Sequence, residues 1–225
     1  MALAERKYKV RSTKYEWHAV KREAARYFRL SPLRRSLTSG NCHLTTDLRQ
    51  LTSDNFSSMH SKRIQLTLFV PENVSAAIEE IRSLYNPVQY NLIAAHVTLC
   101  REDELLDLEQ LQSNLDQIDY PSISVRFGKP ERFDKGKGVL LPALDESSSF
   151  QELRKAVLNG IIIQPRNHQP HITLMHPRNS TCTAEIMEEI RRKELPSAIA
   201  FDHIALIEQL NGGRWKLIRK YPLKS

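Results

Sequence analysis

A four-residue pattern that occurs twice within strand-like sequence is the feature that most restricts how this chain can fold. The two copies are His96-Val97-Thr98-Leu99 and His171-Ile172-Thr173-Leu174. Successive side chains of a β-strand point to opposite faces, so the histidine and threonine of each copy share one face. The apolar residues then face the core. The pattern predicts two half-buried strands that each present an imidazole and a hydroxyl to a cleft.

From residue 59 onward, strand-like and helix-like patterns are interspersed. Alternating or short apolar runs predict strands over residues 64–70, 95–100, 123–127, 138–144, 171–175, 199–210 and 214–221. Helical spacing of apolar residues predicts helices over residues 74–84, 105–118, 149–159 and 183–193. This order does not follow a strict strand–helix–strand rhythm, which favours an α+β fold. Because an amphipathic helix soon follows each histidine strand, we expect two related lobes.

Three short motifs indicate turns and a helix start. Asn211-Gly212-Gly213 predicts a tight hairpin between the last two strands. Lys135-Gly136-Lys137-Gly138 resembles a phosphate-binding loop, but it lacks the GxxxxGK[ST] framework and leads into a strand. A hairpin turn is therefore the better interpretation. Ser149 and Glu152 have the spacing of a capping box, which predicts the start of a helix.

All of the formal net charge of +7 lies in the first 58 residues, which hold 12 Lys and Arg against 5 Asp and Glu. Residues 59–225 hold 21 of each kind and are neutral. We interpret residues 1–58 as a basic, poorly ordered extension and residues 59–225 as the folded domain. The extension could be a transit peptide or a nucleic-acid-binding arm, or translation could start at Met59. The neutral domain must bind any anionic ligand through local geometry.

Hydropathy and cysteine usage exclude several classes of protein. No stretch approaches the roughly 18 uninterrupted apolar residues of a membrane-spanning helix. Cys42, Cys100 and Cys182 stand far apart and form neither a CxxC pair nor an even set. Zinc-ribbon and disulfide-scaffold proteins are therefore excluded, and we expect a reduced, cytoplasmic and monomeric protein without membrane contact.

Two imidazoles that face one another can act as a general acid and a general base. An unperturbed histidine has a pKa of about 6.5, so one ring can be neutral while the other is protonated. This pair can cleave a phosphodiester without metal or cofactor: one ring removes a proton from the attacking water or hydroxyl, and the other protonates the leaving oxygen. The two threonine hydroxyls can donate hydrogen bonds to the phosphoryl oxygens.

Other candidate sites have simpler interpretations. His43-Leu44-Thr45 also reads His-x-Thr, but it lies in the polar extension and no apolar residue follows it. His168, His171 and His176 match no standard spacing of metal ligands. Arg101 and Arg178 follow the two motifs and could hold phosphate, but solvated loop residues are the simpler interpretation. We therefore predict His96 and His171 as the acid–base pair, Thr98 and Thr173 as phosphate-binding residues, and no metal.

These residues resemble the two-histidine (2H) phosphoesterases, which include bacterial RNA 2′,3′-cyclic phosphodiesterases and 2′,5′-RNA ligases. The resemblance covers about residues 62–222 and is carried by the two motifs and the strand before the first of them. It implies a bilobal, pseudo-symmetric α+β fold with antiparallel sheets around a central cleft and helices outside. It also implies the roles already assigned to the four motif residues, and RNA ends or nucleotide cyclic phosphates as substrates.

Two alternatives for the function stay open. One is a phosphodiesterase that acts on small nucleotides, such as an ADP-ribose cyclic phosphate or a 2′,5′-oligoadenylate. The other is a non-catalytic RNA-binding module whose affinity comes from the basic extension. A residue that stacks on a base is expected in either an RNA or a nucleotide site, and Phe127, Phe133 and Tyr90 are unranked candidates.

Overall fold

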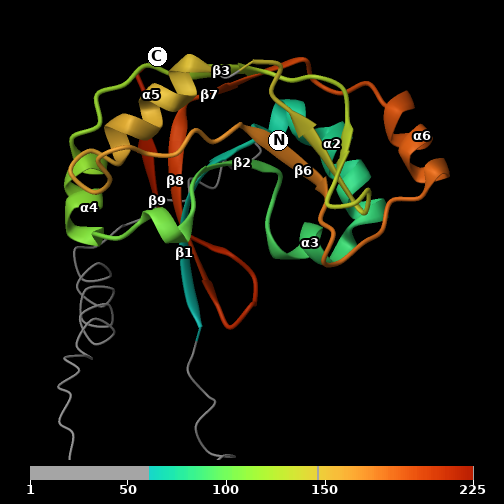
Figure 1. Cartoon of the computed structure of the whole chain (residues 1–225), viewed down its shortest axis with the longest axis horizontal. Helices are drawn as coiled ribbons and strands as arrows, with labels where there is room; N and C mark the ends of the chain where they lie inside the picture. Colours follow the sequence, from blue (N-terminus) through green and yellow to red (C-terminus); the bar gives the residue numbers. More distant parts are fainter. Residues whose placement is uncertain (1–60, 146, 225) are drawn as a thin grey trace, which may run out of the picture. The chain divides into compact units, whose positions relative to one another are not determined.

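The computed structural model describes residues 61–145 and 147–224. The predictions for residues 1–58 and for a start at Met59 lie outside these residues. Figure 1 shows the arrangement of the helices and strands. The strands are β1 (Lys62–Phe69), β2 (His96–Cys100), β3 (Ile123–Arg126), β4 (Glu131–Phe133), β5 (Gly138–Pro142), β6 (His171–Met175), β7 (Ala198–Phe201), β8 (His203–Leu210) and β9 (Lys216–Pro222). The α-helices are α2 (Glu72–Tyr85), α3 (Pro87–Leu92), α4 (Leu108–Asp116), α5 (Ser148–Val157) and α6 (Ala184–Arg192), and η1 (Glu102–Glu104) is a 3₁₀ turn.

A seven-stranded antiparallel sheet carries both histidine motifs. Its strand order is β4-β5-β6-β2-β1-β8-β9, and β3 and β7 pair in a separate two-stranded sheet. The two motif strands, β2 and β6, are central neighbours, with Val97 aligned with Ile172. Each has an equivalent outer neighbour, because β1 pairs with β2 and β5 pairs with β6. The predicted α+β class is confirmed, and the two halves meet along the motif strands.

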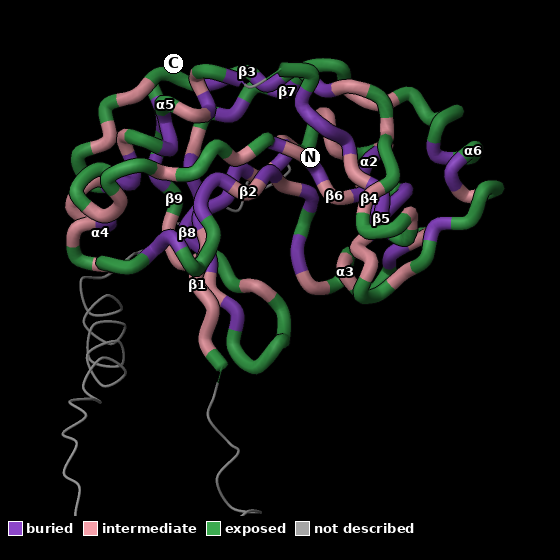
Figure 2. The backbone as a smooth tube through the Cα atoms, in the orientation of Figure 1, coloured by how far each residue is buried: buried purple, intermediate pink, exposed green. Residues whose placement is uncertain are grey.

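The helices α2 and α5 cross to the opposite half of the sheet. α2 follows β1 but packs against β6, and α5 follows β5 but packs against β2 and β3. Both helices bury their apolar stripes, with Ile78 and Ile81 on α2 and Phe150 and Leu153 on α5 all at most 1% exposed. Figure 2 shows buried backbone along the central strands and more exposed backbone in the surrounding segments. Each motif strand is thus supported by a helix of the other half.

Both predicted hairpin turns are confirmed. Lys135 and Gly136 connect β4 to β5 with positive φ angles of 56° and 85°. Asn211 and Gly212 connect β8 to β9 with φ angles of 52° and 70°, and the Gly213 N–H donates to the Leu210 carbonyl at 2.9 Å. Glycine and asparagine tolerate the left-handed region better than most residues, which accounts for Gly136, Asn211 and Gly212, whereas Lys135 adopts it without that preference.

Two predictions about the elements are wrong. The expected strand over residues 199–210 is two strands in different sheets, because the chain leaves β7 at Asp202 and enters β8. The expected capping box at Ser149 does not form, since α5 begins two residues earlier, after Ser147. The Asp145 carboxylate accepts from the Ser147 N–H at 2.9 Å, and Glu152 instead accepts from the Tyr120 hydroxyl at 3.1 Å.

Within the part of the chain that the structure describes, no helix is long and apolar enough to cross a bilayer.

Candidate active site

The two His-x-Thr strands present their polar residues to one cleft of about 320 Å³. His96 and Thr98 on β2 are half-buried, as are His171 and Thr173 on β6. The intervening Val97, Leu99, Ile172 and Leu174 are 0% exposed. The alternation predicted from the sequence is therefore confirmed, and all four motif residues line the same cleft. The other lining residues are Arg63, Gln65, Arg82, Gln89, Ile93, Arg101, Glu102, Phe133, His168, His176, Arg178 and Trp215.

The two imidazoles are held by the same kind of contact. His96 Nδ1 lies 2.8 Å from the Ala94 carbonyl, and His171 Nδ1 lies 3.0 Å from the Gln169 carbonyl. A carbonyl oxygen can only accept, so in each ring Nδ1 carries the hydrogen. In a neutral ring this leaves Nε2 as the basic atom. Each strand thus fixes its imidazole through the residue two positions before it, and frees the same nitrogen for chemistry.

The surroundings of His96 favour its neutral form. Burial lowers the pKa of His96 to about 4, the Ala94 carbonyl partly opposes this shift, and the positive charges of Arg82 and His171 add to it. At neutral pH the His96 ring is therefore uncharged, and its Nε2 can accept a proton.

Thr98 is oriented by a residue that the sequence analysis did not single out. The Gln65 side-chain amide on β1 donates to Thr98 Oγ1 at 2.8 Å. Because this contact occupies an acceptor position on the oxygen, the Thr98 hydrogen is available to donate elsewhere. Gln65 lies on the alternating polar face of a strand whose other face is apolar. That alternation is the sequence signal that could have identified it.

Arginines concentrate positive charge around the cleft although the domain as a whole is neutral. Arg101 and Arg178, which the sequence analysis assigned to solvated loops, both line the cleft. Arg63 and Arg82 line it as well, and neither was singled out from the sequence. Arg82 is buried and pairs with Glu79 at 2.5 Å, which leaves Arg101 and Arg178 as the exposed arginines of the cleft. The carboxylate among the lining residues is that of Glu102, which binds Arg63 Nε at 2.6 Å. The cleft is thus suited to an anionic ligand.

The three candidate stacking residues differ in position. Phe133, at the end of β4, lines the cleft. Phe127 is only 3% exposed, and Tyr90 is exposed but is not among the lining residues. Trp215 also lines the cleft, with the Arg63 guanidinium 5.4 Å from its ring centre. No local pattern marked Trp215 as a cleft residue, because its contact with Arg63 joins residues far apart in the chain.

The histidines at and around the second motif, His168, His171 and His176, do not gather into a metal-ligand set. The rings of His168 and His171 are 5.7 Å apart, and burial lowers the pKa of His168 to about 4. Arg178 donates its backbone N–H to His176 Nδ1 at 3.2 Å. Within residues 61–145 and 147–224, no group of three or more His, Cys, Asp or Glu side chains is arranged to hold a metal ion.

Comparisons with known proteins agree with this geometry. The family model for the 2′-5′ RNA ligase superfamily matches residues 70–213. A Bacillus mycoides protein named "Putative phosphoesterase" is 23% identical over 168 residues, which are 72% of this chain and 96% of the relative. A Bacillus cereus protein of the same name is 22% identical over the same shares of both chains.

Two solved structures of E. coli LigT share the fold. The complex with phosphate has a TM-score of 0.52 and 15% identity, covering 74% of this chain and 99% of LigT. The complex with 3′-AMP has a TM-score of 0.51 and 16% identity, covering 73% of this chain and 99% of LigT. These likenesses confirm the expected two-histidine phosphoesterase fold. Because the family model covers well over half of the chain and includes both His-x-Thr strands, this chain belongs to the 2′-5′ RNA ligase superfamily.

Proposed function

We propose that this protein is a metal-independent phosphoesterase that opens phosphodiesters involving a ribose 2′ oxygen, with a 2′,3′-cyclic phosphate of RNA or a nucleotide as substrate. The observation that carries the proposal is the matched arrangement of the two imidazoles. Each donates Nδ1–H to the carbonyl two residues earlier, and each stands beside a threonine on the same strand face. Two equivalent proton-transfer groups suit a reaction in which one oxygen attacks phosphorus and another leaves.

In the proposed hydrolysis, His96 is the base and His171 is the acid. His96 Nε2 takes a proton from water as the water oxygen forms a bond to phosphorus. The bond from phosphorus to one ribose oxygen breaks, and His171 donates the Nε2 proton to that oxygen. The products are a phosphomonoester and a free ribose hydroxyl, and the exchange of protons prepares the pair for the reverse reaction. The neutral state of His96 in the free protein supports this assignment.

The threonines and arginines complete the proposed mechanism. Thr98, whose oxygen already accepts from Gln65, donates its hydrogen to a phosphoryl oxygen, and Thr173 does the same from β6. The arginines that line the cleft attract the anionic substrate. E. coli LigT, which shares this fold, has been solved with phosphate and with 3′-AMP, and this supports a nucleotide as the ligand.

The chain is proposed to consist of an extension, residues 1–58, and a catalytic domain, residues 59–225. The proposal also includes a location in the cytoplasm, which the dispersed cysteines support, and a monomeric state.

A substrate panel tests the function with the full chain in the presence of EDTA. We expect turnover of 2′,3′-cyclic mononucleotides or of an oligonucleotide that ends in a 2′,3′-cyclic phosphate. Turnover only of an ADP-ribose cyclic phosphate or a 2′,5′-oligoadenylate would favour the small-nucleotide alternative. RNA binding without turnover, which weakens steeply with salt and disappears when residues 1–58 are deleted, would favour the binding module.

The pKa of His96 predicts an unusual pH dependence. The base must be neutral, and its pKa is lowered, so the active form persists well below the usual histidine range. We expect the acid limb of kcat/KM, which reports the free enzyme, to lie near a pKa of about 4. Stopped-flow or discontinuous assays from pH 3.5 to 9 measure it, with circular dichroism to verify folding at each pH. An acid limb near the ordinary value of about 6.5 would contradict the assignment of His96 as the base.

A further inference from the structure

The sheet alone ties the two motif strands together weakly. Between β2 and β6 the aligned pair is Val97 with Ile172, whereas β1 and β8 are in register from Lys62 through Thr67. Acid–base catalysis is sensitive to the separation of its two groups, since a displacement of about 1 Å can cost on the order of 100-fold in rate. A contact that fixes β2 relative to the approach to β6 would therefore matter for the reaction.

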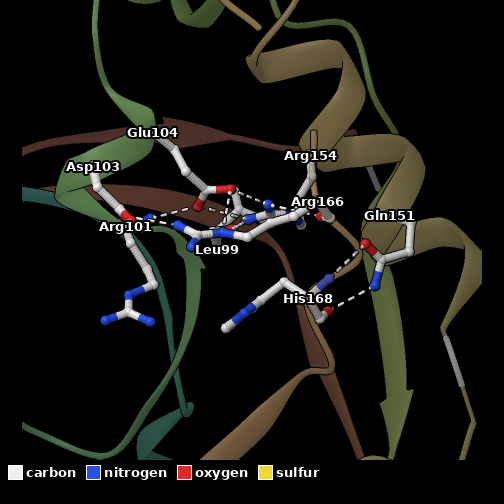
Figure 3. Close-up of polar contacts among 8 residues, drawn as sticks. All are labelled: Leu99, Arg101, Asp103, Glu104, Gln151, Arg154, Arg166 and His168. Atoms are coloured by element: carbon white, nitrogen blue, oxygen red, sulfur yellow. Dashed lines mark hydrogen bonds and ion pairs between the residues drawn. The ribbon is translucent and has the colours of Figure 1, made fainter. Parts of the chain in front are cut away.

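Arg154 on α5 makes such a contact from behind the sheet. Its side chain is 1% exposed, and its guanidinium donates to the carbonyl of Leu99, the last residue of the first motif. The same guanidinium donates to the Arg166 carbonyl at 3.3 Å, in the segment that leads to His171. Figure 3 shows Arg154 reaching from its helix to this junction. One side chain thus holds backbone from both motif segments.

Glu104 supplies the opposite charge at the same place. It is 4% exposed, its Oε1 lies 2.5 Å from Arg154 Nη2, and its Oε2 accepts from the Arg101 backbone N–H at 3.0 Å. Burial opposes ionisation, but the hydrogen bonds from Arg154 and from the Arg101 backbone outweigh it and lower the pKa of Glu104. The carboxylate is therefore charged at neutral pH. Through Arg101, the pair also fixes the start of the loop whose arginine lines the cleft.

One turn before Arg154, the same helix also contacts the segment that leads to the second motif. The Gln151 side chain donates to the His168 carbonyl at 2.7 Å, and the His168 N–H donates back to Gln151 Oε1 at 3.5 Å. His168 lies three residues before His171. Two turns of α5 therefore hold the backbone that leads into β6, and Arg154 joins this segment to β2.

We propose that Arg154 and Glu104 are positioning residues that form a strut between the two motif strands and set the separation of His96 and His171 for catalysis. The inference rests on the proposed function. A buried ion pair is weak evidence for a role in stability, because apolar residues of similar size often replace such pairs without loss of stability. The strut instead provides what an apolar pair cannot, namely donors for two specific backbone carbonyls.

The exchange of Glu104→Leu together with Arg154→Met in the full chain tests the strut. Glu104 also pairs with Arg166 Nε at 3.2 Å, but Arg166 is 46% exposed and keeps its ion pair with Asp103. Removing Arg154 and Glu104 together therefore leaves no unpaired buried charge, and the variant is expected to fold, as measured by circular dichroism and thermal unfolding. We expect kcat on the proposed cyclic phosphate substrate to fall about 100-fold. KM should change much less, because the arginines that attract the substrate remain.

Two controls separate positioning from stability. Glu188→Leu with Arg191→Met makes the same exchange in an exposed ion pair on α6, and kcat should not change. Val157→Ala removes buried volume from α5 without touching the strut, and it should lower the unfolding temperature but not kcat. A folded strut variant with wild-type kcat would overturn the proposal.

Two further measurements apply if the double variant does not fold or if the wild-type protein has no turnover. If the double variant does not fold, Arg154→Lys replaces it, because one ammonium cannot reach Glu104 and both carbonyls together. A drop in kcat of about tenfold supports the strut, and an unchanged kcat overturns it. If the wild-type protein has no turnover, the proposed function fails. The strut is then tested by the ring NMR signals of His96 and His171 at saturating inorganic phosphate. Signals at the same positions in the wild type and in the variant would overturn it, and signals that move for both rings would support it.

Discussion

Replacing His171 by alanine is expected to lower kcat about a thousandfold on a 2′,3′-cyclic phosphate, and His96→Ala is expected to do the same. Each substitution removes a proton-transfer group whose Nε2 has no substitute on the same strand. Both side chains are only half-buried, so the fold should remain intact and KM should change little. Steady-state kinetics together with thermal unfolding of each variant measure both effects.

A histidine outside the cleft provides the matched control for these variants. His203 on β8 pairs with Asp202 and is not among the residues that line the cleft. His203→Ala should therefore retain wild-type kcat. Near-wild-type turnover by His171→Ala would eliminate the paired-imidazole mechanism, whatever the result for His96→Ala.

The threonine hydroxyls are expected to have the second-largest effect. Thr98→Val and Thr173→Val keep the side-chain shape but remove a donor to the phosphoryl oxygens, so kcat should fall about 100-fold in each. The fall should exceed any rise in KM, because charge on these oxygens builds up in the transition state. Gln65→Leu should produce a smaller fall, since it leaves the Thr98 hydroxyl in place without its orienting donor.

An exposed threonine serves as the control for this series. Thr181 lies in the loop before α6, is exposed and is not among the lining residues, so Thr181→Val should behave as wild type. If Thr98→Val and Thr173→Val raise KM but leave kcat unchanged, the hydroxyls bind the substrate without stabilising the transition state. That result would contradict their proposed role.

Local patterns predicted the parts of the fold that depend on local geometry. The two-residue period of a strand placed His96 and Thr98 on one face, and the side-chain burial of β2 and β6 confirms it. The hairpin at Asn211 was predicted because few residues adopt positive φ readily. In both cases the determining interactions lie within a few residues of the chain.

Contacts between distant segments were beyond the reach of the same reasoning. Arg154 and Glu104 are 50 residues apart, and they meet only because α5 crosses to the opposite half of the sheet. Gln65 reaches Thr98 because β1 and β2 pair in one particular register. No periodicity in the sequence specifies that crossing or that register.

The arginines after the two motifs show why exposure alone was a poor guide. Arg101 and Arg178 are exposed loop residues, as the sequence suggested. However, β2 and β6 are antiparallel neighbours, so the loops that follow them lie at opposite ends of the paired strands. The cleft is lined by residues of both strands, so an exposed arginine that follows either strand can still line it.

The kinetics of the combined variant His96→Ala with His171→Ala, compared with both single variants, test the central claim most directly. If the two imidazoles act as one pair, the combined variant should be no slower than the slower single variant, because removing either partner already stops proton exchange. Independent losses that multiply, or a single variant with most of the wild-type turnover, would show that the two histidines do not work as an acid–base pair.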